Sequence, residues 1–148
     1  MINPGYTVSR VKWHEAEPAL RYIRKSVFID EQSVPEELEW DNLDDACMHI
    51  LVKNSRGVPI ATARIKADGH IGRMAVLKPY RHQGVGSAIL DNLIDYCKQH
   101  KLKAHLDAQT NAIAFYQQKG FECASDEFMD AGIPHKSMIL EEKRNGRY

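Results

Sequence analysis

RHQGVGS (residues 81–87) stands between an apolar, strand-like run and a long helical pattern. Gly84 and Gly86 carry no Cβ, so the backbone can approach a ligand closely at both positions. The first turn of a helix also presents unpaired N–H groups and the positive end of the helix dipole. These features favour an anion site, with phosphate as the usual guest and Arg81 as a forked, permanently charged donor. A plain tight turn between strand and helix is the alternative interpretation.

The helical pattern after this turn is strongly amphipathic. Apolar residues recur every four positions along one face, and two further apolar residues widen it. They are Val85, Ile89, Leu93, Cys97, Leu90 and Ile94. Three strand-like runs precede the turn, over residues 47–53, 58–66 and 70–77. Short turns that contain Gly with Asn or Asp join these runs, so we predict three consecutive antiparallel strands.

The N-terminal part of the chain predicts a strand and a helix. The alternation over residues 6–12 is typical of a strand. The helix after it has Pro18 in its first turn and should end near Gln32. Residues 33–45 are acidic and contain a proline, which predicts a loop or a short helix.

The C-terminal part predicts a strand over residues 102–108, a short helix over 111–118, a strand from Phe121 onward and a final strand over 136–141. Asn111 is expected to cap the start of the short helix and Gly120 its end. The whole order favours an α/β (α+β) fold, in which helices cover both faces of a mixed sheet.

Size and composition indicate one domain over residues 1–148. The chain is 43% hydrophobic, which is enough for one buried core, and 148 residues are too few for two ordinary domains. Lys plus Arg and Asp plus Glu each number 20, so the formal net charge is zero, which argues against a general nucleic-acid binder. No run of about 18 apolar residues occurs, so no membrane span is expected. The three cysteines are scattered and odd in number, which favours a reducing cytoplasm over a disulfide framework.

Two other phosphate-binding motifs fit the turn poorly. A Walker loop needs a lysine directly before Ser87, and this turn lacks one. A dinucleotide-binding fingerprint needs Gly or Ala at the position of Ile89, and it belongs to a βαβ unit, whereas we predict an antiparallel meander here. Metal binding is not expected, because Cys97, His100 and His105 fall short of a ligand set.

A second stretch, NAIAFYQQKGF (residues 111–121), reads as a strand end followed by a short helix. Taken alone, Phe115, Tyr116 and Phe121 indicate core aromatics. Together with the glycine turn and the order of elements, this stretch resembles the GCN5-related N-acetyltransferases, the GNAT family.

The resemblance extends over nearly the whole chain. Residues 27–32 (VFIDEQ), His49 and residues 132–138 (GIPHKSM) are similar to the small bacterial ElaA-like branch of the family. The resemblance implies the GNAT fold, with a mixed and mostly antiparallel central sheet of about six to seven strands flanked by helices on both faces.

The resemblance also implies acetyl-CoA as a co-substrate and no metal. In such enzymes the backbone N–H groups of the glycine turn hold the pyrophosphate of coenzyme A. The strand over residues 74–76 would pair with the pantetheine arm, and the N–H near Met74 would polarise the acetyl carbonyl. The implied cofactor-binding residues are Met74, Ala75, Val76, Arg81, His82, Gln83, Gly84, Val85, Gly86, Ser87, Asn111, Ala114 and Phe115, the last three at the thiol end. His82 stands where the family often has glycine, and its role is open.

The implied chemistry is direct attack of an amine on the acetyl thioester in a ternary complex. A lysine amine has a reference pKa of about 10.4, so a base or a water chain must remove a proton from it. The resemblance suggests Glu31, His49 and His135 for this base, and each is equally compatible with an ordinary hydrogen-bonded role. Tyr116 matches the general acid that serves the departing thiolate.

Several alternatives stay open on the sequence alone. An acidic run is most often a solvated surface, and its alternative role is to attract a cationic amine. The run consists of Glu36, Glu37, Glu39, Asp41, Asp44 and Asp45. The acceptor is a small amine or a protein amine, and a homodimer is compatible with the family, in which dimers are common. The rival functions are a non-catalytic acyl-CoA-binding sensor of the same fold and an interaction protein whose glycine turn is only structural.

Overall fold

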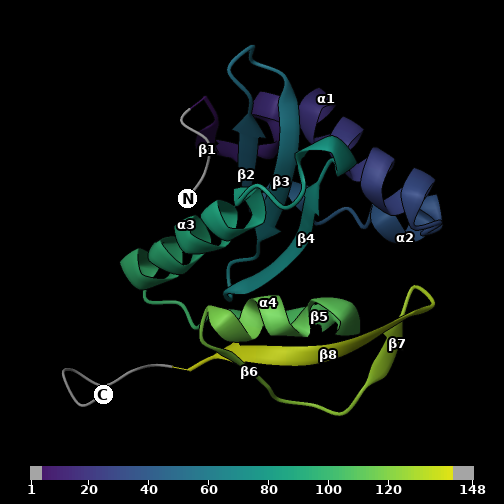
Figure 1. The fold of residues 1–148 in the computed structure, drawn as a ribbon, viewed down its shortest axis with the longest axis vertical. Helices are drawn as coiled ribbons and strands as arrows, with labels where there is room; N and C mark the ends of the chain where they lie inside the picture. Colours follow the sequence, from purple (N-terminus) through teal and green to yellow (C-terminus); the bar gives the residue numbers. More distant parts are fainter. Residues whose placement is uncertain (1–4, 142–148) are drawn as a thin grey trace.

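Eight strands within residues 5–141, the part of the chain that the computed structural model describes, pair into one sheet (Figure 1). Their order is β1-β2-β3-β4-β5-β8-β6, and β7 pairs with β8 beside this path. Only β4 and β5 pair in parallel, so the prediction of a mixed, mostly antiparallel sheet is confirmed, with eight strands in place of about six to seven. The strands are β1 (Thr7–Lys12), β2 (Met48–Lys53), β3 (Pro59–Ile65), β4 (His70–Val76), β5 (His105–Gln109), β6 (Phe121–Cys123), β7 (Phe128–Asp130) and β8 (Ile133–Leu140).

Helices cover both faces of this sheet (Figure 1). Alternate residues of a strand point to opposite faces. Ile50 and Val52 of β2 accordingly pack in the cluster that contains α3, whereas Leu51 packs in the cluster that contains α1. The helices are α1 (Trp13–Arg24), α2 (Glu36–Glu39), α3 (Val85–His100) and α4 (Ile113–Gln118), with a π-helical segment η1 (Lys25–Glu31) and 3₁₀ turns at Asp44–Ala46, Lys78–Tyr80 and Thr110–Ala112.

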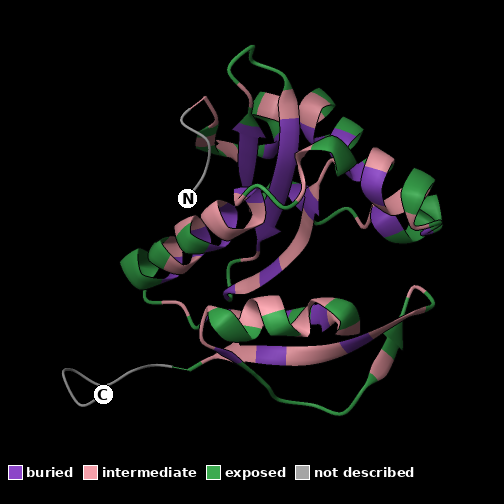
Figure 2. Cartoon of the chain, viewed as in Figure 1, coloured by how far each residue is buried: buried purple, intermediate pink, exposed green. Residues whose placement is uncertain are grey.

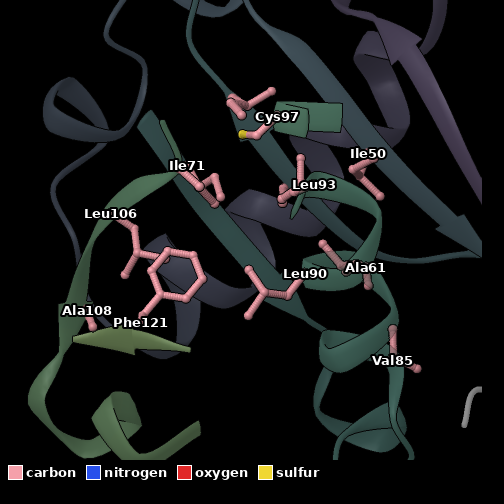
Figure 3. Packing of buried hydrophobic residues seen from close by; sticks show 14 of the residues in the cluster. Ile50, Ala61, Ile71, Val85, Leu90, Leu93, Cys97, Leu106, Ala108 and Phe121 are labelled. Atoms are coloured by element: carbon pink, nitrogen blue, oxygen red, sulfur yellow. The ribbon is translucent and has the colours of Figure 1, made fainter. Parts of the chain in front are cut away.

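The main core lies between α3 and the sheet. Figure 3 shows Leu90 and Leu93 of α3 beside Ile71 and Phe121, and all four side chains are buried. Most of β2 and β3 is buried as well (Figure 2). The predicted apolar face of the long helix is confirmed, because Val85, Ile89, Leu90, Leu93 and Cys97 are its buried residues.

The first helix differs in detail from the prediction. It begins at Trp13 and is kinked at Ala16, whose φ of −143° and ψ of 22° are not helical. Pro18 therefore falls in the first turn after the kink, where its fixed φ is tolerated. The π-helical segment carries the chain on to Glu31, next to the predicted end at Gln32.

The hairpin β7–β8 is absent from the sequence-based prediction. Asp130 pairs with Ile133 around a two-residue turn at Ala131 and Gly132, both of which have positive φ, 51° and 77°. Such turns join antiparallel strands tightly, and Ala is uncommon at this conformation, so the sequence signal is weak. The final strand consequently begins at Ile133 and not at residue 136, the expected start.

The predicted N-terminal cap of the short helix is also wrong. Asn111 lies inside the 3₁₀ turn Thr110–Ala112, and Ala112 occupies the cap position of α4, because the strand end first makes a tighter turn. At the other end, Gly120 has a φ of 99° and its N–H donates to the Gln117 carbonyl, as predicted for a C-terminal glycine.

The sheet divides between β4 and β5. Their parallel pairing consists of His70↔His105 and Ile71↔Leu106. Further along, β3 and β4 are aligned at Thr62↔Ala75 and at Arg64↔Gly72, and between these pairs β4 has one residue more than β3. Arg73 lies in this bulge and has a φ of 51°. A bulge bends its strand and increases the local twist. The C-terminal half of β4 therefore turns away from β5 and leaves a split in the sheet.

Gly69 lies at the closed end of this split, where its carbonyl accepts the His105 N–H. A methyl group at this position should destabilise the fold. A Cβ at Gly69 would collide with the Lys103 backbone carbonyl, and its φ of 94° disfavours side chains. We expect Gly69→Ala to lower the free energy of unfolding by about 2–4 kcal/mol in urea titrations. Gly57→Ala is the matched control, because Gly57 also has positive φ (77°) but a Cβ there meets nothing within 4 Å. It should lose only about 1 kcal/mol. Equal losses would show that backbone strain alone matters.

Candidate active site

The glycine turn and α4 line one cavity of about 520 Å³. Both sequence stretches that carried the family resemblance therefore meet in space. The lining residues are Val76, Tyr80, Arg81, His82, Gly84, Val85, Gly86, Ser87, Phe115, Gln118 and Lys119. Of the predicted cofactor-binding residues, Gln83 is exposed, Ala75 is buried in the α1 cluster, and neither lines this cavity.

The backbone of the turn is arranged to bind an anion. Gly84 precedes α3 with a φ of 83°, and the Ala88 N–H donates the first bond of the helix, to the Gly84 carbonyl. The N–H groups of the three residues between them therefore point out of the helix end toward the cavity. His82 has a φ of 63°, a conformation in which glycine is favoured and histidine is tolerated. This explains how a side chain replaces the glycine that the family often has there.

Arg81 is fixed by a carboxylate and does not project freely. Its Nη1 and Nη2 donate to the two Glu31 oxygens at 2.7 and 2.6 Å, and its Nε donates to the Val76 carbonyl at 2.8 Å. The hydrogen bond from Arg81 is the main reason why the pKa of Glu31 lies below its usual value. A carboxylate held in this way is a weak base, and its contacts make it a clamp between η1 and the glycine turn.

The split exposes one edge of β4. Thr62 pairs with Ala75, and the Leu77 N–H donates to the Ile60 carbonyl. Because backbone groups alternate along an antiparallel strand, the N–H groups of Met74 and Val76 point away from β3, into the split. This edge can pair with an extended ligand that carries amide groups.

A second cavity, of about 350 Å³, lies on the other side of the split. Segments from η1, α2, β4, β5 and the β7–β8 hairpin line it. Tyr116 of α4 lies on its wall with its hydroxyl 3.9 Å from the Met74 sulfur, and burial raises the pKa of Tyr116 to about 12. Phe115 lines the first cavity and Tyr116 the second, so neighbouring residues of α4 border both cavities.

His135 is the one predicted base that lines the second cavity. Its Nδ1 is 2.7 Å from the Ile133 carbonyl, which can only accept, so the neutral ring carries its proton there and leaves Nε2 as an acceptor. His49 lies elsewhere: it is fully buried against Trp13, with Nε2 3.0 Å from the Asp44 carbonyl. Asn111 and Ala114, which we expected at the thiol end, are exposed and line neither cavity.

The acidic run divides into two parts: Glu36, Glu37 and Asp45 are exposed, as expected for a solvated surface, whereas its other three members are paired with arginines. Glu39 and Asp44 are buried, and Arg24 donates to both, at 2.7 and 2.6 Å. Arg64 and Arg73 complete the pairing together with Asp41. Hydrogen bonds from Arg24 and Arg64 hold the pKa of Asp44 below its ordinary value although burial opposes this. Glu39, Asp41 and Asp44 therefore fasten α2 and the loop after it onto the β4 bulge.

Sequence reasoning missed several polar residues of the second cavity. Gln109 donates to Gln32 at 3.0 Å, and both line it. Asp107 and Asp130 line it as well, from β5 and β7. The alternation of β5 could have shown that Asp107 and Gln109 share one face, but nothing local indicated that this face borders a cavity.

Within residues 5–141 no cluster of three or more His, Cys, Asp or Glu side chains is placed to hold a metal ion. Over the same residues, no helix is long and apolar enough to cross a membrane.

A sheet split between parallel strands, with a glycine turn and helix end beside the split, defines the class of acyl-CoA N-acyltransferases. The acetyltransferase (GNAT) domain model matches residues 13–142, and the chain belongs to this family as an acyltransferase of the branch that contains ElaA. It is 42% identical over 130 residues to protein YyaT of Bacillus subtilis, covering 83% of this chain and 87% of YyaT. It is 34% identical over 133 residues to ElaA of Escherichia coli, covering 83% of this chain and 86% of ElaA.

Solved structures agree in fold. The crystal structure of Escherichia coli ElaA superimposes with a TM-score of 0.81 at 27% identity, covering 91% of this chain and 99% of ElaA. An acyl-CoA N-acyltransferase from Pseudomonas aeruginosa gives a TM-score of 0.83 at 23% identity, covering 92% of this chain and 99% of that protein.

Proposed function

We propose that the protein transfers an acetyl group from acetyl-CoA to a primary amine, by direct attack within a ternary complex. The observation that carries this proposal is the pair of cavities on the two sides of the split, bordered by neighbouring residues of α4 and β4. One cavity has the chemistry of a diphosphate site and the other is polar enough for an amine. Such an arrangement holds two reactants together and lowers the entropic cost of the reaction.

The residues of the first cavity fit coenzyme A. The N–H groups at the start of α3 would receive the pyrophosphate, and the exposed edge of β4 would pair with the amides of the pantetheine arm. Lys119 also lies on the cavity wall, where its ammonium is paired with Asp91 at 2.8 Å. The thioester then lies near Met74, whose N–H stabilises the oxyanion that forms on the acetyl carbonyl.

The reaction forms a C–N bond and breaks the C–S bond. Nε2 of His135 accepts the proton that the amine loses, directly or through a water molecule. Tyr116 donates to the departing thiolate sulfur. Because its pKa is about 12, its phenol stays protonated over the pH range of such enzymes. Burial also favours the protonated form of the leaving thiol, which assists the same transfer.

Gly86 offers a direct test of the diphosphate site, because it lies in the first turn of α3 and lines the first cavity. Gly86→Glu would place a carboxylate where the phosphates should bind, and we expect the dissociation constant for acetyl-CoA to rise about 100-fold by calorimetric titration. Gly86→Gln is the control, with nearly the same size and no charge, and it should cost about tenfold or less. Both variants should fold, because a Cβ at Gly86 meets only Phe115, at 3.7 Å. Unchanged affinity in Gly86→Glu would refute this location of the site.

The proposed activity itself is tested by thiol detection of released CoA in a screen of amine acceptors. We expect release that depends on both acetyl-CoA and the amine. Binding of acetyl-CoA without turnover on any amine would favour the sensor, and absence of binding would favour the interaction protein.

A further inference from the structure

Within residues 5–141, the Arg and Lys side chains that line the first cavity are each paired with a carboxylate. They belong to Arg81 and Lys119. Arg81 donates to both Glu31 oxygens, at 2.7 and 2.6 Å, and Lys119 donates to Asp91 at 2.8 Å. Neither Glu31 nor Asp91 lines the cavity itself. An anion that enters the cavity therefore meets two cations whose charges are already balanced from outside it.

The pairing of Arg81 with Glu31 lies near the surface, where it can be exchanged. The Arg81 side chain is 29% exposed and the Glu31 side chain is 40% exposed. An ion pair exposed to this degree stabilises a fold only weakly, because water solvates both partners and salt screens them. The two parallel hydrogen bonds make this pair stronger than most exposed pairs. Glu31 can nevertheless turn into water at a small cost in free energy.

A diphosphate is a stronger partner for the Arg81 guanidinium than one carboxylate. Phosphate oxygens accept two parallel hydrogen bonds as a carboxylate does, and a diphosphate carries more negative charge. If Glu31 stayed in place, its charge would face that of the diphosphate across a single guanidinium, and like charges repel. The bond from Arg81 Nε to the Val76 carbonyl, at 2.8 Å, does not involve Glu31 and holds the side chain beside the cavity.

We propose that Glu31 competes with the diphosphate of acetyl-CoA for Arg81, so that the guanidinium leaves the carboxylate when the diphosphate binds. This rests on the proposed function. Glu31 thereby lowers the affinity for the cofactor. It also assists the release of CoA, because the carboxylate recaptures the guanidinium as the diphosphate leaves.

Glu31→Gln measures the competition, since it removes the charge and keeps the size of the side chain. We expect the dissociation constant for acetyl-CoA to fall about two- to fivefold by calorimetric titration. Fivefold corresponds to about 1 kcal/mol, the upper value for an exposed ion pair. The dissociation rate of CoA in stopped-flow measurements should fall by a similar factor. Asp30→Asn is the matched control. It removes the neighbouring exposed carboxylate, which is paired with Lys25, and should leave both quantities nearly unchanged.

A second substitution shows whether the competition involves Arg81. Arg81→Gln should weaken the binding of acetyl-CoA about tenfold, because a hydrogen-bonded charge is lost. In this background Glu31→Gln should bring no gain, because no guanidinium remains to compete for. An equal gain with and without Arg81 would mean that Glu31 acts by charge repulsion alone, and would overturn the proposal.

The outcomes separate this inference from the proposed function. Weaker binding of acetyl-CoA in Glu31→Gln would show that the carboxylate keeps the glycine turn in shape for the cofactor. Unchanged binding would show that the pair with Arg81 does not oppose the diphosphate. Either result would overturn the competition and leave the cofactor site where it is. A wild-type protein that does not bind acetyl-CoA would instead contradict the proposed function.

Discussion

Tyr116→Phe is expected to lower kcat about 100-fold or more while the dissociation constant for acetyl-CoA stays within about twofold. General acids in enzymes typically contribute about 10²- to 10⁴-fold. The variant removes one hydroxyl, whose contact in the structure is the Met74 sulfur at 3.9 Å. The lower part of the range applies, because a phenol with a pKa of about 12 gives up its proton reluctantly and acts largely as a hydrogen-bond donor to the sulfur.

Steady-state release of CoA and calorimetric binding of acetyl-CoA measure the two quantities separately. The substitution preserves the aromatic ring at this position. The edge contacts of that ring with Phe115 and Phe121, at 5.1 and 6.1 Å between ring centroids, are therefore kept, and the melting temperature should hardly change. Undiminished kcat in Tyr116→Phe would remove Tyr116 from the chemistry.

Arg24→Met is expected to lower the free energy of unfolding by about 3–5 kcal/mol at pH 7, the range found when one partner of a buried ion pair is removed. Arg24 is 1% exposed and donates to Glu39 and Asp44, which are also buried. Methionine fills much of the space but leaves two carboxylates without this partner. Urea unfolding measures the loss.

Arg21→Met is the matched control. Like Arg24, Arg21 stacks on Trp13 and Trp40. Its ion pair with Glu17 is exposed, so the variant should lose less than about 1 kcal/mol. Similar losses in the two variants would mean that stacking on tryptophan matters more than the buried ion pairs.

The difference in unfolding free energy between the wild type and Arg24→Met should become smaller as the pH falls from 7 toward 4. Arginine partners lower the pKa of Asp44 in the folded protein, so their stabilisation is present above its unfolded pKa of 3.8 and is lost as the pH falls through the folded value. Without Arg24, the opposing effect of burial on Asp44 counts for more, so this carboxylate takes up a proton at higher pH than in the wild type. Unfolding at a series of pH values measures this change, and a difference independent of pH would contradict the electrostatic explanation.

Much of the fold was predictable because its signals are local. The spacing of Val85, Ile89 and Leu93 identifies a helix face without knowledge of any neighbour. The hairpin β7–β8 was missed because its turn has Ala131 at positive φ, where a local signal is weak. Most residues that line the first cavity were also among those singled out from the sequence, since they cluster around one continuous stretch of the chain.

The lining of the second cavity was much less predictable. Its side chains come from η1, α2, β4, β5 and the hairpin, and their positions depend on how those elements meet. Glu31 illustrates this: its chemistry allows a base, but its pairing with Arg81, 50 residues away along the chain, makes it a clamp. His49 likewise has the chemistry of a base and is buried behind Trp13.

The sequence by itself determined the order of elements apart from β7, together with the glycine turn and the family, because periodicity and a missing Cβ act over a few neighbouring residues. Only the tertiary structure decided which charges are paired and which remain free. The bulge at Arg73 opens the sheet beside Asp107, and the arginines neutralise Glu39 and Asp44. Charge pairing depends on distances through space between residues far apart in the chain, and a linear pattern does not contain those distances.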